Sequence, residues 1–158
     1  MKINGKKIEG ANTAIIPIPR ASSEDIILKV KAILDMTPFE KMCPPPVAPK
    51  KMIPGGKEVV NLRDAGYLAQ VDKYSIQRLN WIVLTSLEAT DDLEWETVDM
   101  SNPNTWSNFR KEMQDSGLSN VEINRVVAEC INVNALNEAK IEEARERFLL
   151  EAQELDEE

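Results

Sequence analysis

The chain has 158 residues, of which 42% are hydrophobic and 29% are charged, as is typical of a globular protein and not of a disordered one. One domain of this length can bury a core without metals or disulfides, and the two distant cysteines, Cys43 and Cys130, make no disulfide framework. The sequence contains no histidine, which removes the commonest general base and the commonest zinc ligand. We therefore expect a protein that is not an enzyme and that has no catalytic residues, no metal and no cofactor.

Charge is divided unevenly along the chain. Residues 1–60 carry a net charge of +4, whereas residues 61–158 carry −12. A strongly acidic part repels nucleic acid and anionic membranes alike. The sequence has no apolar run of membrane-spanning length, and its first residues lack the apolar core of a signal peptide. We expect a cytoplasmic protein that binds other proteins, with no nucleic-acid or membrane partner.

The first 42 residues are expected to be rich in β-structure. The Asn-Gly pair at 4–5 is typical of a hairpin turn. Two short segments rich in β-branched residues follow at 14–19 and 26–34, and the prolines of the first restrict it to the edge of a sheet. Between 37 and 43 the sequence TPFEKMC predicts a short helix, with Thr37 as N-cap and Glu40 closing a capping box.

Residues 43–60, CPPPVAPKKMIPGGKEVV, are predicted to form an extended strap. Its prolines favour a polyproline-type path, and Gly55 and Gly56 predict a turn. The segment does not match a phosphate-binding loop, because Lys51 and Glu58 occupy the positions where that motif has glycine and a hydroxyl residue. Whether the strap lies on its own domain or reaches a neighbouring molecule is left open.

From residue 61 onward the pattern becomes helical. A central, buried helix is predicted from about 64 to 89, with Ile76, Leu79, Val83 and Leu87 on one stripe. An acidic connector at 88–106, with a short extended piece around Trp95, leads to a helix that begins at Asn102 and Pro103 and ends at Gly117. Ser119 and Glu122 predict a capping box at the start of the next helix, and the final helix ends in an acidic tail.

These elements together predict the fold class and the domain organisation. The class is α+β, with a small N-terminal antiparallel β portion followed by a mainly α-helical bundle of about four helices. We expect a single domain, 1–158, made of a β-rich portion with a short helix (1–42), the strap (43–60), a helical portion (61–153) and an acidic tail (154–158).

The candidate functional residues are those of a partner-binding surface. Trp95 and Trp106 flank the acidic connector and are either core residues or interface anchors. The last helix has one apolar stripe, which either packs on the domain or lies in a groove of a partner. The acidic run at 91–96 lacks the ligand spacing of a calcium loop and is expected to be a solvated connector. The predicted partner-binding residues are Trp95, Trp106, Ile141, Phe148, Leu149 and Ala152.

Three segments resemble small proteins of tailed bacteriophages. They are SLEATDDLEWETVDMSNPNTW (86–106), EINRVVAECINVNALNEAKIEEARERFL (122–149) and the stretch from CPPP to PGGK (43–57). The chain is similar to the tail-assembly chaperones of long-tailed phages. This resemblance implies a small, acidic, mainly helical protein that binds the tape-measure protein, keeps it soluble and helps tail-tube subunits gather on it. The net-basic first third and the strap depart from the simplest helical chaperones.

The leading hypothesis is a non-enzymatic chaperone of tail assembly in the host-cell cytoplasm, which holds a helix-prone partner through its C-terminal helices. A second hypothesis is a minor structural protein of the virion tail, whose strap and first strands pair with a neighbouring subunit. A third is a phage inhibitor of a host protein, whose acidic face imitates nucleic acid. The partner is expected to be the tape-measure or tail-tube protein, and a homo-oligomer is left open.

Overall fold

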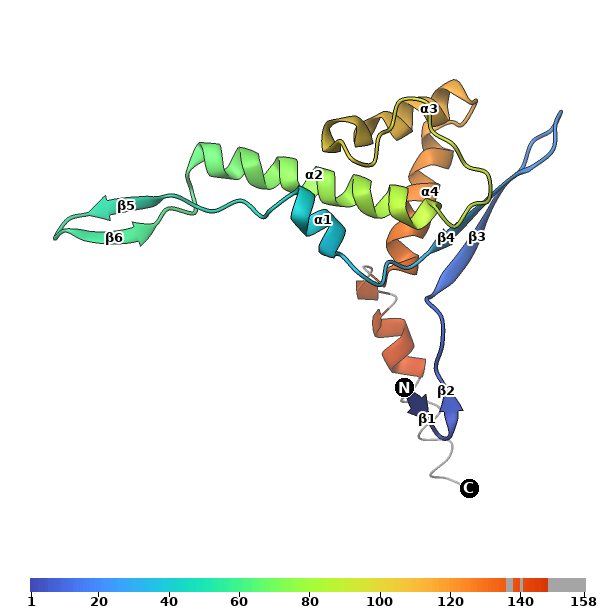
Figure 1. Ribbon diagram of the computed structural model, residues 1–158, viewed down its shortest axis with the longest axis horizontal. Coiled ribbons are helices and arrows are strands. Elements are labelled where there is room, and N and C mark those ends of the chain that lie inside the picture. Colours follow the sequence, from blue (N-terminus) through green and yellow to red (C-terminus); the bar gives the residue numbers. More distant parts are fainter. Residues whose placement is uncertain (136–137, 140, 148–158) are drawn as a thin grey trace. The chain divides into compact units, whose positions relative to one another are not determined.

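The computed structural model describes residues 1–135, 138–139 and 141–147. The chain divides into two compact units, which we call the first unit (1–33, 85–93 and 118–158) and the second unit (34–84 and 94–117). Short antiparallel strand pairs near the N-terminus are followed by helices, so the predicted α+β class is confirmed (Figure 1). The strands form three separate two-stranded ribbons, and the third of these follows the first helix.

In the first unit, the N-terminal ribbon pairs β1 (Lys2–Ile3) with β2 (Lys6–Lys7). The two-residue loop between them is Asn4-Gly5, with φ of 50° and 77°. Positive φ at both loop residues is what a type I′ hairpin turn requires, and Asn-Gly adopts it readily. The predicted turn is therefore confirmed.

The second ribbon pairs β3 (Thr13–Ile18) with β4 (Ile26–Lys31), and Ile16 lies opposite Leu28. Every second residue is buried, as expected for a ribbon with one covered face. The predicted strand at 26–34 is too long, since pairing ends at Lys31 and Leu34 is 81% exposed. The buried residues of this ribbon are Ile16, Ile18, Leu28 and Val30.

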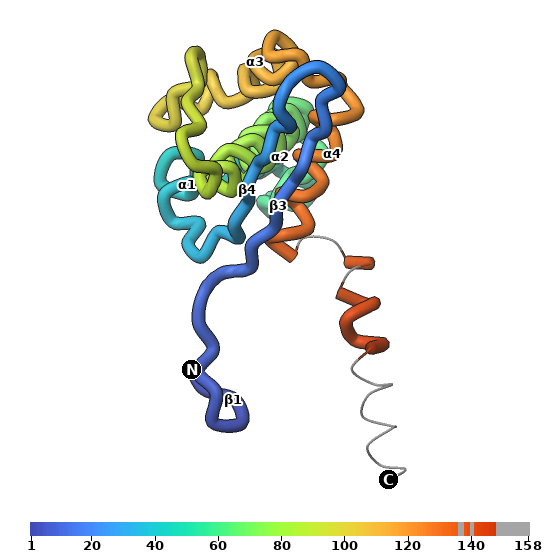
Figure 2. Tube along the Cα trace, turned by 90° about the vertical axis from the view of Figure 1, so that its right-hand side faces the viewer, coloured from blue at the N-terminus to red at the C-terminus, as the bar shows by residue number. Residues whose placement is uncertain are grey.

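Helix α4 (Asn120–Val133) covers the buried face of the β3–β4 ribbon (Figures 1 and 2). It begins with the predicted capping box, in which Ser119 Oγ accepts from the N–H of Glu122 and the Glu122 carboxylate accepts from the N–H of Ser119. Spacing of three and four residues places its apolar side chains on one face. Those buried are Ile123, Val126, Val127, Cys130 and Val133.

Two helices form the centre of the second unit, α1 (Thr37–Met42) and most of α2 (Ala65–Leu87). The predicted capping box of α1 is wrong, because Thr37 is already the first helical residue and Met36 is the N-cap. The carboxylate of Asp35 accepts from the N–H of Thr37 instead, at 2.9 Å. Thus a side chain one residue before the cap satisfies a donor of the first turn.

Helix α2 has the predicted extent but not the predicted apolar stripe. Val83 and Leu87 are fully buried, whereas Ile76 is 60% exposed and Leu79 is only half-buried. Full burial begins near Asn80 and continues through the last two turns. The first half of α2 therefore presents apolar and amide side chains at the surface.

The third ribbon pairs β5 (Lys50–Ile53) with β6 (Lys57–Val60) inside the predicted strap. Pro54 and Gly55 occupy the centre of a turn closed by the N–H of Gly56 and the carbonyl of Ile53 at 3.2 Å. Gly55 has φ of 99°, which suits the third position of a type II turn. The predicted turn is confirmed, but the strands on either side of it were not predicted.

The remaining elements of the second unit follow the acidic connector. A 3-10 helix, η1 (Pro103–Asn108), begins after Asn102, whose side chain accepts from the N–H of Asn104, and leads into α3 (Phe109–Asp115). Gly117, with φ of 93°, follows α3 and confirms the predicted C-terminal stop. The extended piece predicted around Trp95 is absent, since no described residue of the connector lies in a strand.

Candidate partner-binding surfaces

The predicted interface residue Trp106 lies in the core of the second unit. Its side chain is fully buried, and its ring lies 6.3 Å from that of Phe39. Phe39 also contacts Tyr74 and Trp81, at 5.5 and 5.7 Å between ring centroids. The core alternative therefore describes Trp106, whose side chain does not reach the surface.

Trp95 has an intermediate position. It is half-buried, and its ring meets that of Phe109 edge-on, with centroids 6.4 Å apart. One side of the indole therefore packs on α3 while the rest remains accessible. An aromatic side chain of this kind retains surface for a partner.

The C-terminal candidates begin with Ile141, in the helical segment 141–147 of the first unit. All seven of these residues are exposed, and Ile141 is 38% exposed. Ala144 lies three residues further on, so both face the same side of the helix. The other three candidates, Phe148, Leu149 and Ala152, lie outside the described residues.

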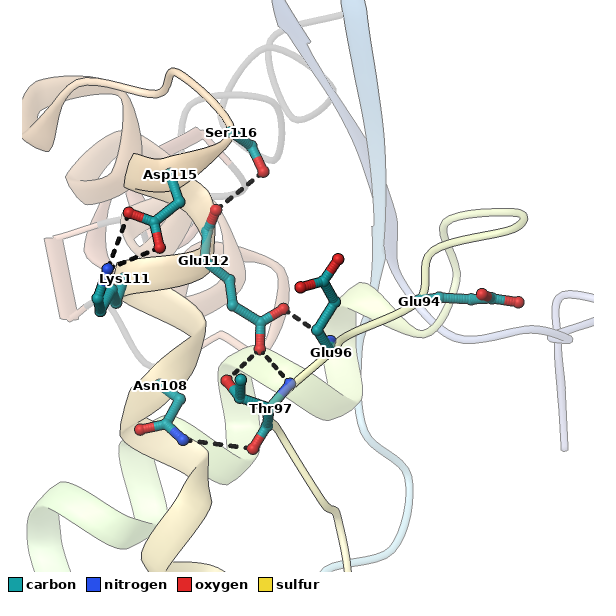
Figure 3. A pocket seen from close by; sticks show the side chains of 8 residues that line it. All are labelled: Glu94, Glu96, Thr97, Asn108, Lys111, Glu112, Asp115 and Ser116. Carbon is teal, nitrogen blue, oxygen red and sulfur yellow. Dashed lines mark hydrogen bonds and ion pairs between the residues drawn. The ribbon is translucent and has the colours of Figure 1, made fainter.

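An acidic hollow of about 450 Å³ lies between the connector and α3 in the second unit (Figure 3). Glu112 projects from α3 and accepts hydrogen bonds from the main-chain N–H of Glu96 and Thr97, at 2.9 and 2.7 Å, and from the Thr97 hydroxyl. Burial raises the pKa of Glu112, but the bonds from the Thr97 side chain and the main chain outweigh it and hold the pKa below its ordinary value. Glu112 thus fastens the connector to α3.

The other polar groups of this hollow are also engaged or solvated. Lys111 pairs with Asp115 one helical turn away, at 2.7 Å. The carboxylate of Glu94 points away from Glu112 in Figure 3. The arrangement is that of a structural clamp, because its central carboxylate is saturated by its own chain.

A groove runs along α2 in the second unit, opposite the first part of the strap and the start of η1. It consists of two hollows of about 360 and 350 Å³ that share Lys73, Gln77, Pro103 and Asn104. Asn80 lines one end and is 8% exposed. Residues Gln77 and Asn80 were not singled out from the sequence, although their spacing of three on a predicted helix would have placed them on one face.

Both cysteines are held in the thiol form. Burial raises the pKa of the Cys43 thiol, although Lys73 opposes this effect. Burial, followed by the charge of Glu129, raises the pKa of the Cys130 thiol to about 12. Because the thiolate is the nucleophile, neither cysteine is activated near neutral pH.

Comparison of the chain with protein-family models, curated proteins and solved structures finds no match. In the described part of the chain, no three Asp, Glu or Cys side chains are grouped so that they could hold a metal ion. None of the described helices combines the length and apolar content that a membrane span requires.

Proposed function

We propose that the chain is a non-enzymatic assembly protein of a tailed bacteriophage, which acts in the host-cell cytoplasm and holds a helix-prone partner such as the tape-measure protein. The observation that carries this proposal is the exposure of the helical segment 141–147. Its apolar residues Ile141 and Ala144 are not covered by the described part of the chain. The choice of partner rests on the resemblance to tail-assembly chaperones.

The charges of this segment suit a helix that pairs with another helix. Arg145 Nη1 donates to Glu142 Oε2 at 2.6 Å, one turn earlier on the same helix. Charged residues therefore flank the apolar side, as they do where two amphipathic helices pack along a narrow seam. A partner helix that covers Ile141 and Ala144 would remove apolar surface from water, which favours association.

Co-expression tests this proposal. The chain is produced together with the tape-measure protein of its own phage, and the soluble fraction is purified through a tag on the chain. We expect the tape-measure protein to be soluble and to co-purify, and to be insoluble when it is expressed alone. Recovery of an insoluble tape-measure protein and a free chain contradicts the proposal.

The β5–β6 ribbon favours a second candidate, a minor structural protein of the virion tail. None of residues 50–60 is buried, and an isolated two-stranded ribbon has marginal stability in water. Pairing with a neighbouring subunit would complete such a ribbon. Mass spectrometry of purified virions separates the two candidates, because a chaperone is absent from them and a structural protein is present.

A further inference from the structure

The groove on α2 is built from residues at regular helical spacing. Gln70, Tyr74 and Gln77 follow one another at intervals of four and three residues, and Asn80 continues the row. Over ten residues the helix rises about 15 Å, which is the length of about four or five residues of an extended chain. The opposite wall is formed by Pro44, Pro46, Pro103 and Asn104.

Asn80 is the most buried polar residue that lines this groove. Its side chain is 8% exposed, and among the described residues its amide has no hydrogen-bond partner. The amide atoms of Asn80 are not among the fully buried side-chain atoms that lack a partner, so they remain accessible from the groove. Since Asn80 lines the groove, a bound molecule can reach the amide and satisfy it.

The groove has one charged lining residue, Lys73, near its middle. No ion pair joins Lys73 to another described residue. The rest of the lining consists of apolar side chains, amides and the two hydroxyls of Tyr74 and Ser107. Such a surface is complementary to an apolar segment with one acidic side chain, and a single cation is a poor match for a polyphosphate.

We propose that this groove binds an extended, apolar and acidic segment of a partner polypeptide by its main chain. The amide of Asn80 has the same donor and acceptor groups as a peptide unit, so it can bond the N–H and C=O of one residue at once. An extended segment carries unpaired main-chain groups, whereas a helix has already used its own. This site is separate from Ile141 and is independent of the function proposed above.

A blocked peptide tests the proposal, with acetyl-Leu-Val-Asp-Val-Leu-amide as the probe. Its β-branched residues favour an extended form. The side-chain NH₂ signals of Asn80 and Gln77 are followed by NMR as the peptide is added to the full chain at millimolar concentrations. We expect both signals to shift and to saturate. A peptide with N-methylated main-chain nitrogens should bind about tenfold more weakly, because it has lost its donors.

Two substitutions locate the binding. Asn80→Leu keeps the size of the side chain and should weaken peptide binding about tenfold, while Lys73→Gln should weaken it about threefold. Ser75→Ala, at an exposed position of the same helix, is the control and should leave the affinity unchanged. Lys73 is exposed, so its variant remains informative if Asn80→Leu fails to fold.

Three results overturn the proposal. One is a failure of the expected binding: the shifts do not saturate, or the methylated peptide binds as tightly as the unmodified one, or Asn80→Leu binds the peptide as tightly as the natural chain does. Another is tighter binding of an alanine-rich helical peptide to the same residues, which makes the occupant a helix. The last is a concentration-dependent shift of these signals without peptide, which makes the occupant a second copy of this chain.

Discussion

Arg20 Nη1 donates a hydrogen bond to Glu122 Oε1 at 2.7 Å. Because Arg20 lies two residues after the end of β3, this bond links the β3–β4 ribbon to the first turn of α4. The second oxygen of the same carboxylate accepts from the N–H of Ser119 at 2.8 Å. The bond from Arg20, and then that from the Ser119 main chain, lower the pKa of Glu122 from 4.5 to about 2. One carboxylate therefore both caps the helix and fixes the ribbon beside it.

Acid should weaken this link. Glu122 has a depressed pKa in the folded chain, so its stabilising contribution is complete above the ordinary pKa of 4.5 and is lost as the pH falls toward about 2. Glu122→Gln should be less stable than the natural chain near neutral pH, and the difference should shrink below about pH 4. Urea unfolding followed by circular dichroism across this range measures it. Glu88→Gln, at an exposed position, is the control, and a pH-independent difference contradicts the assignment.

Removal of the Thr97 hydroxyl should loosen the connector. Thr97→Val keeps the shape of the side chain but deletes one donor to Glu112, which should cost about 1 kcal/mol. Urea unfolding monitored by tryptophan fluorescence measures the loss, because Trp95 lies in the same connector. Ser107→Ala, at an exposed position of η1, is the control. A stability equal to that of the natural chain excludes the proposed clamp.

The two tryptophans should differ in what they contribute to stability. Trp106→Ala removes a fully buried ring and should lower the free energy of unfolding by about 3–5 kcal/mol. Trp95→Ala, at a half-buried position, should cost much less. Thermal unfolding of both variants measures the loss of stability that each substitution causes. Binding of the tape-measure protein is measured separately, so that an effect on binding is not confused with an effect on stability. If Trp106→Ala leaves stability unchanged, its assignment to the core is wrong.

The β5–β6 ribbon should open without unfolding the protein. Gly55→Ala places a side chain at φ of 99°, which should speed hydrogen exchange of the Val59 amide about fivefold or more. The unfolding midpoint should not change, because no residue from 50 to 60 is buried. Lys51→Ala is the matched control, since it leaves the turn intact. A large drop in the midpoint would mean that the ribbon belongs to the core.

Local signals predicted the parts of the fold that depend on few residues. The capping box at Ser119 and Glu122 is closed within three residues, and Asn4-Gly5 specifies its own turn. The similar pattern at Thr37 failed because Asp35, two residues before Thr37, supplies the acceptor, so the helix begins sooner and Met36 is its N-cap. The same three-residue spacing is therefore compatible with two different starts.

Features that depend on distant segments escaped prediction. The β5 and β6 strands show no alternation of buried and exposed residues, and prolines precede and separate them. The row of amides on α2 could have been found from its spacing, but its opposite wall includes Pro103 from a remote segment. The exposure of Ile76 is likewise set by which neighbours cover α2 and not by its own periodicity.

The most direct measurement of the central claim is the affinity of the tape-measure protein for variants of the C-terminal helix. Ile141→Asp places a charge on the exposed apolar side, while Glu143→Gln alters the same helix without adding one. Titration of a soluble tape-measure fragment by calorimetry should give about tenfold weaker binding for Ile141→Asp and little change for Glu143→Gln. Equal affinities for Ile141→Asp and the natural chain would contradict the claim that this helix holds the partner.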